Sequence, residues 1–277
     1  MGKLAFLVGC CYLNTEDALK GCYNDVDAMQ DLLINRFGFH RNDVIVLTDM
    51  PNSPLKPTGY LGRPLLQTIV PSDFNLKYSD DFRYMVNNMP QGADFVMIAD
   101  SCNSGGLIDQ SKEQVGPGFR PDVCYPTRPC NEVWGKVKMI PMTSIVQHLR
   151  PLSHINSSDI RTLLTNIYGT NASIMFQGPL NPQLLNSFMV DGGILISACQ
   201  SNEASIDDQK DIRPHGVFTD ALYYSLRYQP GPITYKSLVE IIRAQLTSQR
   251  PCLYCSDQHA SAPFLRHIPN VFSRLLM

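Results

Sequence analysis

The sequence has little net charge, a single tryptophan and no long apolar run. Its 277 residues carry 23 basic and 25 acidic side chains, which leaves a net charge of −2. This balance gives no reason to expect a nucleic acid or another polyanion as a partner. No apolar segment approaches the ~20 residues of a membrane-spanning helix, so we expect no membrane partner. A chain of this length can bury a full hydrophobic core.

The N-terminus lacks the charged stretch and cleavage site of a secretory signal. We therefore expect a cytoplasmic chain whose thiols are reduced. Nine cysteines are an odd number, so they cannot all pair with one another. Cys252 and Cys255 form a C-x-x-C motif, but no second pair stands at ligand spacing, so the motif is weak evidence for zinc.

The first fifty residues alternate between strand and helix patterns. Residues 4–8 are apolar and end at Gly9, which predicts a buried parallel strand. Residues 17–37 carry apolar side chains at helical spacing, and residues 44–47 predict a second strand. This order predicts an α/β fold in which helices flank a mostly parallel sheet.

The later segments continue the alternation less regularly. Residues 80–89 predict a short helix that Ser79 can cap, and residues 95–99 predict a strand. The polar, proline-rich residues 110–131 predict an exposed linker, and residues 142–185 are weakly helical. Further on we expect a buried strand at 193–199, helices at 217–227 and 235–246, and an edge strand at 252–255.

Cys102 stands where an active-site residue of such a fold is expected. It follows the predicted strand 95–99 and precedes Gly105 and Gly106. In open parallel sheets, sites form beyond the carboxyl ends of the strands. Glycines allow close backbone approach, and their amides could hold an oxyanion. Spacing alone leaves two alternatives open, a nucleophile and a buried structural thiol.

Six segments stand in a characteristic order along nearly the whole chain. They are GCYNDV at 21–26, PTG at 57–59, IVPSDFNL at 69–76, DSCNSGGLID at 100–109, SACQ at 197–200 and PCLYCSDQ at 251–258. Together they resemble metacaspases, the plant, fungal and protozoan relatives of caspases. The last segment is similar to the closing strand of the plant type II branch.

The resemblance implies a caspase-like fold and a cysteine endopeptidase with Cys102 as nucleophile. It places Cys22, Asp25 and Asp100 in an acidic pocket for a basic residue before the scissile bond. Carboxylates bind ammonium and guanidinium groups strongly, so cleavage after Arg or Lys is implied, whereas caspases prefer Asp. Lys138 stands where type II enzymes cut themselves. The alternatives are an exposed helix carboxylate for Asp25 and an exposed linker residue for Lys138.

The resemblance also implies a possible calcium site but no cofactor for the chemistry itself. The implied calcium ligands are Asp73, Asp80, Asp81 and Asp109, and oxygen donors of this kind suit a hard cation. The alternative for Asp80 and Asp81 is stabilisation of a helix start. By the same resemblance, residues 1–110 form a large-subunit-like region that bears the nucleophile, 111–190 a linker region and 191–277 a small-subunit-like region.

One family motif is missing. Metacaspases carry their histidine in a Y-S-G-H-G motif between the P-T-G and I-V-P segments, but residues 60–68 contain no histidine. We expect that a strand and its histidine loop are lost near residues 66–67. The lost strand would be central, so the first strand and the Cys102 strand either pair directly or leave the sheet open between them. His215 is the least improbable substitute base.

Loss of the histidine predicts impaired catalysis, because an ordinary thiol is mostly protonated at neutral pH and the leaving amine needs a proton. Three functional alternatives remain open. The chain is a weakly active endopeptidase for protein or peptide substrates with Arg or Lys before the cut. The second alternative is an inactive homologue that regulates or binds other metacaspases. The third is a shortened product without a function of its own.

Overall fold

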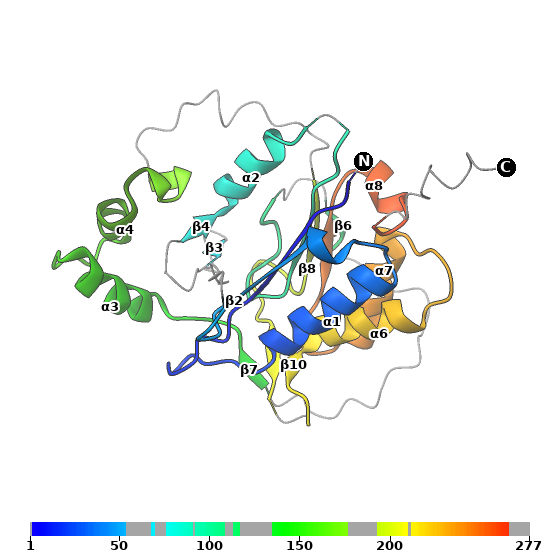
Figure 1. Ribbon diagram of the computed structural model, residues 1–277, viewed down its shortest axis with the longest axis horizontal. Helices are drawn as coiled ribbons and strands as arrows, with labels where there is room; N and C mark the ends of the chain where they lie inside the picture. Colours follow the sequence, from blue (N-terminus) through cyan, green and yellow to red (C-terminus); the bar gives the residue numbers. More distant parts are fainter. Residues whose placement is uncertain are drawn as a thin grey trace.

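The computed structural model describes residues 2–53, 68–69, 76–90, 92–108, 113–116, 135–176, 193–209 and 212–265. Figure 1 shows these parts in colour along the chain. The segments predicted at 57–59 and 70–75 lie outside the described residues, as does most of the predicted linker 110–131. The other predicted strands and helices can be compared with the structure directly.

Four strands form the main sheet in the order β5 (Val96–Ala99), β8 (Ile194–Ser197), β11 (Cys252–Tyr254) and β6 (Glu113–Val115). β5 and β8 are parallel, whereas β11 is antiparallel to both β8 and β6. Two predictions are wrong here. Residues 252–255 are not an edge strand, because β6 covers the outer side of β11. Residues 113–115 are not an exposed linker, because Val115 is fully buried in that pairing.

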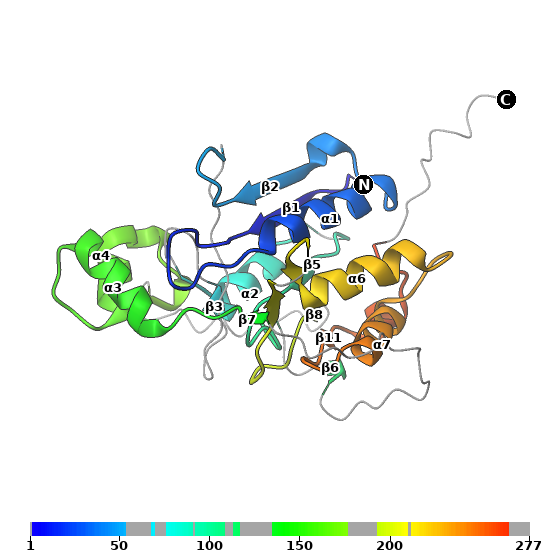
Figure 2. The ribbon, with the colours of Figure 1, turned by 90° about the horizontal axis from the view of Figure 1, so that it is seen from below.

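Side chains of the main sheet alternate between two apolar layers, as strand geometry requires. Ile194 and Ile196 face a core that also contains Phe218 and Leu238, whereas Leu195 faces a core with Val86. The first core is covered by α1 (Cys22–Asn35), α6 (Val217–Tyr228) and α7 (Tyr235–Gln245), and the second by α2 (Ser79–Asn87). Figures 1 and 2 show these helices on the two sides of the strands. The predicted helices at 217–227 and 235–246 are confirmed.

The first two strands form a separate sheet. β1 (Ala5–Gly9) and β2 (Val44–Thr48) pair in parallel, and among the described strands neither joins β5. Of the two expected arrangements, direct pairing of β1 with β5 is not present among the described strands. Leu4 and Phe6, before and within β1, are 62% and 59% exposed. Helix α1 connects the two sheets, since it packs on β1 and on α6. The loss of a whole strand here stays a prediction.

Two short antiparallel sheets and several helices complete the fold. One sheet joins β7 (Gly135–Val137), β9 (Ile206–Asp208) and β10 (His215–Gly216), and the other joins β3 (Thr68–Ile69) and β4 (Lys77–Tyr78). The described parts of the chain also contain α3 (Met142–Ser153), α4 (Ile160–Tyr168), α8 (Asp257–Ser261) and the 3₁₀ turns η1 (Arg41–Asp43), η2 (Gly169–Asn171) and η3 (Ile174–Phe176).

Helices α3 and α4 lie beside each other, away from α6 and α7 (Figure 2). They bury Leu149, Leu163 and Leu164 in another core, which also contains Leu19 and Leu76. Residues 142–185 were predicted to be weakly helical, which α3 and α4 confirm for their part of the range. No helix in the described ranges is long and apolar enough to cross a membrane.

Two helices begin at other residues than predicted, because carboxylate side chains bind the backbone amides at their starts. α1 begins at Cys22 rather than at residue 17. Just before Cys22, the Lys20 and Gly21 amides donate hydrogen bonds to the Asp207 carboxylate at 2.9 and 3.0 Å. α2 already includes Ser79, so Ser79 is not its cap. Asp81 instead reaches back to the Tyr78 amide at 2.8 Å. The carboxylates of Asp207 and Asp81 therefore accept hydrogen bonds from free backbone amides at the two helix starts.

Leucine-to-alanine substitutions should separate the main sheet from the exposed strand. Leu195 is fully buried in β8, so Leu195→Ala should lower the free energy of unfolding by ~2–5 kcal/mol. Leu4→Ala removes the same atoms from a side chain that is 62% exposed and should cost under ~1 kcal/mol. Urea denaturation of both variants measures the difference. Equal losses would contradict the placement of the core.

Candidate functional site

The Cys102 thiol lies just beyond the end of β5 and is buried, with 1% of the residue exposed. Its Sγ accepts a hydrogen bond from the Ser205 amide at 3.1 Å and lies 3.5 Å from the Ser205 carbonyl oxygen. The next residue, Asn103, donates its amide to the Glu203 carbonyl at 2.9 Å and adopts a left-handed conformation with φ of 54°. The loop before β9 therefore holds the thiol in place.

Burial raises the pKa of the Cys102 thiol to about 11. Asp100 raises it as well, whereas the Ser205 amide and the Lys138 ammonium lower it. A thiol with this pKa is almost entirely protonated at neutral pH. Cys102 therefore needs a base before it can act as a nucleophile.

Two carboxylates near the thiol, those of Asp25 and Asp100, surround the Lys138 ammonium of the same chain, and we call the place between them the acidic pocket. The Lys138 Nζ lies 3.0 Å from Asp100 Oδ2 and 3.6 Å from Asp25 Oδ2. Asp25 comes from the first turn of α1, and Asp100 follows β5 directly. The Lys138 side chain is 4% exposed and each carboxylate side chain 13%, so water screens their attraction only weakly. Cys22 lies close enough to raise the pKa of Lys138 together with the two aspartates.

Neutral donors complete the pocket. The Ser205 hydroxyl donates to Asp100 Oδ1 at 2.5 Å, and the Thr219 hydroxyl donates to Asp100 Oδ2 at 2.7 Å. The Gly216 amide donates to both oxygens of Asp25, at 2.9 and 3.0 Å. Buried carboxylates need such partners to offset the loss of hydration. β8, β9 and β10 place the loops that supply them.

The two aspartates titrate differently because their partners differ. Burial would raise the pKa of Asp100, but the nearer Lys138 ammonium and the hydroxyls of Ser205 and Thr219 outweigh it, so the pKa of Asp100 is lowered. Burial raises the pKa of Asp25 to about 7, because Lys138 is farther from it and Asp100 repels a second negative charge. Burial would lower the pKa of Lys138, but both carboxylates raise it. Lys138 and Asp100 form the stronger ion pair.

Lys138 reaches the pocket from a strand that lies along β9. β7 pairs antiparallel with β9, and the Lys138 amide then donates to the Ser205 carbonyl at 2.9 Å. Ser205 therefore contacts both the thiol of Cys102 and the backbone of Lys138. An added strand whose side chain enters a pocket is a common mode of peptide recognition. Lys138 is 5% exposed, so the alternative of an exposed linker lysine is wrong.

Several residues of the site have no role in the sequence-based prediction. Gly216 lies where any Cβ would overlap the side chains of Asp25, Asp100 and Lys138. The amide and the hydroxyl of Thr219, in the first turn of α6, both donate to Asp100 Oδ2. The helical pattern of α6 was visible in the sequence, but nothing in that pattern indicates that its first turn meets β5. Only the three-dimensional arrangement reveals these roles.

The described histidines form no hydrogen bond with the nucleophile. None of His40, His148, His154, His215 and His259 hydrogen-bonds to Cys102. His215 Nδ1 contacts the Arg213 carbonyl at 3.0 Å, and its Nε2 lies 3.8 Å from Asp220. His267 lies outside the described residues. The substitution of His215 for the missing base therefore has no support from its hydrogen bonds.

The predicted calcium ligands are only partly described. Asp73 and Asp109 lie outside the described residues. Asp80 pairs with Arg83 at 3.5 Å, and Asp81 accepts hydrogen bonds from the Ser173 hydroxyl and the Ile174 amide at 2.6 and 3.0 Å. Within the described ranges, no three His, Cys, Asp or Glu side chains form a metal-binding group. Both described aspartates already have protein partners.

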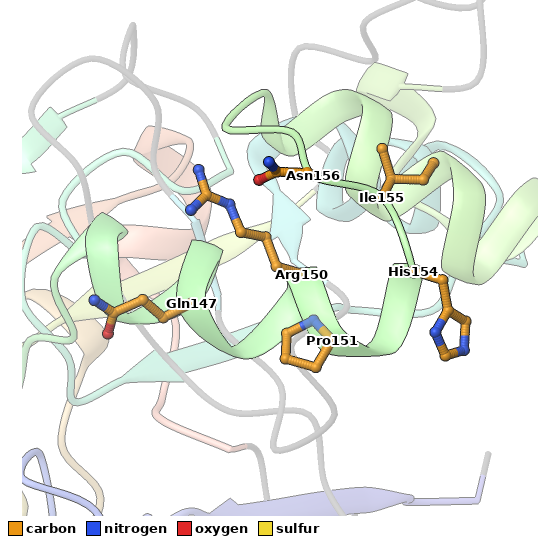
Figure 3. A pocket seen from close by; sticks show the side chains of 6 residues that line it. All are labelled: Gln147, Arg150, Pro151, His154, Ile155 and Asn156. Atoms are coloured by element: carbon orange, nitrogen blue, oxygen red, sulfur yellow. The ribbon is translucent and has the colours of Figure 1, made fainter.

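A surface pocket elsewhere involves none of the predicted site residues. It lies at the end of α3 and the following loop and is shown in Figure 3. Its lining residues are Gln147, Arg150, Pro151, His154, Ile155 and Asn156. The side chains in Figure 3 carry one guanidinium and one imidazole but no cysteine or carboxylate. The acidic pocket beside Cys102 is therefore the stronger candidate for the active site.

Comparisons with known proteins identify the family. The family model described as "Metacaspase, peptidase C14 domain" matches residues 3–60, and the model described as "Caspase domain" matches residues 62–262. Metacaspase-9 of Arabidopsis thaliana is 38% identical, with 95% of this chain and 96% of that protein covered. The chain belongs to the metacaspase family of cysteine peptidases. The predicted family and the caspase-like α/β fold are confirmed.

More distant metacaspases and a solved structure extend the comparison. Metacaspase-6 of Arabidopsis thaliana is 27% identical, with 96% of this chain and all of that protein covered. Metacaspase-1 of Schizosaccharomyces pombe is also 27% identical and is covered over 67% of its length. A crystal structure of a Geobacter sulfurreducens protein superposes with a TM-score of 0.57 at 14% identity, covering 95% of this chain and 97% of that one, which supports the fold alone. Caspase-like cysteine peptidases need no cofactor for their chemistry.

Gly216→Ala tests the packing of the acidic pocket in this metacaspase. The added methyl group would overlap Asp25, Asp100 and Lys138, so the variant should lose ~1–3 kcal/mol of unfolding free energy. Gly2→Ala is the matched control, because nothing lies within 4 Å of its new Cβ. Thermal or urea denaturation compares the two. If both variants are as stable as the unmodified protein, Gly216 does not form the floor of the pocket.

The pH dependence of Cys102 alkylation tests the state of the thiol. Only the thiolate reacts, so with a pKa of about 11 the rate should rise ~10-fold per pH unit between pH 7 and 9. At pH 7 it should be ~100-fold slower than that of an unperturbed cysteine with a pKa of 9.0. Iodoacetamide labelling with mass spectrometry measures the rate. A plateau below pH 8 would reveal a base paired with Cys102.

Proposed function

We propose that this metacaspase recognises protein or peptide segments with Arg or Lys before the cut, and that loss of the histidine-bearing segment impairs its catalysis. The observation that carries the proposal is the Lys138 ammonium between Asp25 and Asp100, beside the Cys102 thiol. Two buried carboxylates would oppose an acidic side chain in this pocket. They favour an ammonium or a guanidinium, which offers charge-assisted hydrogen bonds.

Lys138 is also the proposed site of self-cleavage, at the bond to Met139. Its backbone runs on from β7 beside β9, and its amide bonds to the same Ser205 that contacts Cys102. Its side chain fills the pocket in which a basic substrate residue would bind. The segment around Lys138 therefore resembles a substrate supplied by the chain itself. While it occupies the pocket, it competes with any other basic peptide.

Impaired catalysis follows from the state of the thiol and from the gap in the chain. Cys102 has a pKa raised to about 11 and no hydrogen bond to a described histidine. The alignment with Metacaspase-9 runs over 316 positions, which exceeds the 277 residues of this chain and therefore contains gaps in it. The two family models meet at residues 60–62, near the proposed loss at 66–67. A missing general base costs ~10²–10⁴-fold in rate.

A second candidate function uses the same pocket for binding, without cleavage of a peptide bond. The acidic pocket, and the edge of β9 once β7 has left it, need no histidine to bind a basic segment. The chain would then act as a binding or regulatory partner, for instance of other metacaspases with an exposed basic linker. Calcium binding by Asp73, Asp80, Asp81 and Asp109 and a cytoplasmic location remain predictions that either function could include.

Cleavage of reporter peptides by a Lys138→Gln variant, which frees the pocket, tests the proposed function. We expect slow cleavage after Arg and Lys, ~10²–10⁴-fold below that of a metacaspase with its histidine, and none after Asp. Cys102→Ala should abolish it, because it removes the nucleophile. Fluorogenic reporters measure the rates, and circular dichroism checks the fold, since an unpaired buried charge costs ~3–5 kcal/mol.

The outcome separates the two functions. If pure protein shows no turnover but binds an Arg peptide by calorimetry, and Asp25→Asn weakens that binding, the partner function holds and the peptidase is excluded. Preference for an Asp reporter, or cleavage that survives Cys102→Ala, would contradict the specificity or the nucleophile.

A further inference from the structure

The Gln249 side chain is buried, although it belongs to the loop between α7 and β11. Its Oε1 accepts a hydrogen bond from the Ile206 amide at 3.1 Å, and its Nε2 donates to the Ala198 carbonyl at 3.0 Å and to Ser205 Oγ at 3.4 Å. Ala198 directly follows β8, Ile206 begins β9, and Ser205 directly precedes β9. One side chain therefore joins the end of β8 and the start of β9 to the loop before β11.

The two backbone partners of Gln249 need opposite groups from it. The Ile206 N–H needs an acceptor, whereas the Ala198 carbonyl needs a donor, and a side-chain amide carries one of each. A charged glutamate has no donor, and a methionine has neither group. Because a buried polar group without a partner costs free energy, this position requires the amide and not only its shape.

The hydrogen bond to the Ile206 N–H also sets the direction of the Ser205 carbonyl. Both groups belong to one planar peptide unit, in which the N–H and the C=O point to opposite sides. While Gln249 holds the N–H, the carbonyl faces away from Gln249. There it accepts a hydrogen bond from the Lys138 amide at 2.9 Å and lies 3.5 Å from Cys102 Sγ. Gln249 therefore aims this carbonyl at the site.

The hydrogen bond to Ser205 Oγ sets the direction of that hydroxyl. Gln249 Nε2 is a donor, so the oxygen accepts at this contact, and its own proton is left for Asp100 Oδ1 at 2.5 Å. The Ser205 amide donates to Cys102 Sγ at 3.1 Å. Three groups of one serine thus contact the thiol, the acidic pocket and the Lys138 backbone, and Gln249 holds that serine from the opposite side.

We propose that Gln249 is a positioning residue of the active site, which holds Ser205 where it orients Asp100 toward a basic side chain and binds the Cys102 sulfur. Gln249 reaches the site through Ser205, so its effect depends on where the serine lies. The inference rests on the proposed function in one respect, namely that a basic segment binds in the acidic pocket. It makes the loop before β11 a part of the site.

Binding of an Arg peptide tests this role. The Lys138→Gln chain, in which the pocket is free, is compared by calorimetry with the same chain carrying Gln249→Met, which keeps the length of the side chain but has no amide. The second chain should bind ~10-fold more weakly, because the Ser205 hydroxyl is no longer held to a charged carboxylate. Gln245→Met is the matched control and should bind as before, since its amide donates to Ser225 Oγ at 3.0 Å, between α7 and α6.

Gln249→Glu adds a pH profile to the same measurement. At pH 8 the charged carboxylate accepts from Ile206 but donates nothing, so binding should be ~10-fold weaker than in the Lys138→Gln chain at that pH. At pH 5.5 the carboxyl group, whose pKa burial raises, regains a donor, and binding should recover to within ~3-fold. Comparison at equal pH removes the titration of Asp25. Gln249→Met should stay weak at both pH values.

Amide hydrogen exchange in the chain that keeps Lys138 gives a result independent of peptide binding. In Gln249→Met the Lys138 and Ser205 amides should exchange ~10-fold faster, whereas amides inside α6 should not change. If the Lys138→Gln chain binds no Arg peptide, the proposed function fails and this exchange alone decides the role of Gln249. Unaltered exchange at both amides, or a lower melting temperature with unaltered peptide affinity, would overturn the proposal. Should Gln249→Met fail to fold, Gln249→Glu at the two pH values supplies both measurements.

Discussion

The buried contact of the Lys138 ammonium with Asp100 and Asp25 joins three parts of the chain that are far apart in sequence. It connects the first turn of α1, the end of β5 and the strand β7. Burying these charges costs hydration, which the ion pair and the hydrogen bonds from Ser205, Thr219 and Gly216 offset. The nucleophile lies beside this contact and shares Ser205 with it. The same contact thus both stabilises the site and occupies it.

The site also depends on the connection between two separate sheets, the β1–β2 pair and the main sheet. β1 and β2 pair only with each other among the described strands, and helix α1 connects them to the main sheet. The first turn of α1 supplies Asp25, and the Asp207 carboxylate fixes where that turn begins. The acidic pocket is therefore assembled although β1 and β5 do not pair directly among the described strands. Whether the chain retains a general base is part of the proposed function, since among the described histidines none is hydrogen-bonded to Cys102.

Much of the fold could be predicted because the local sequence pattern determines several of its helices and strands. The helices near Val217 and Tyr235 and the strand near Val44 match the structure closely, since periodic apolar faces mark them. The position of β11 inside the sheet could not be predicted, because the strand that covers it, β6, comes from a polar segment. Strand pairing of this kind depends on distant partners rather than on local composition.

The candidate site shows the same limit. Motifs indicated Cys102, Asp25 and Asp100, and the structure brings them together, although their roles remain predictions. The burial of Lys138 could not be predicted, because its charge is matched only by carboxylates distant in sequence. Amine labelling of the native protein tests this contact most directly, with exposed Lys236 as the internal reference. The account predicts that Lys138 stays unlabelled until the protein is denatured; labelling of Lys138 as fast as Lys236 would contradict it.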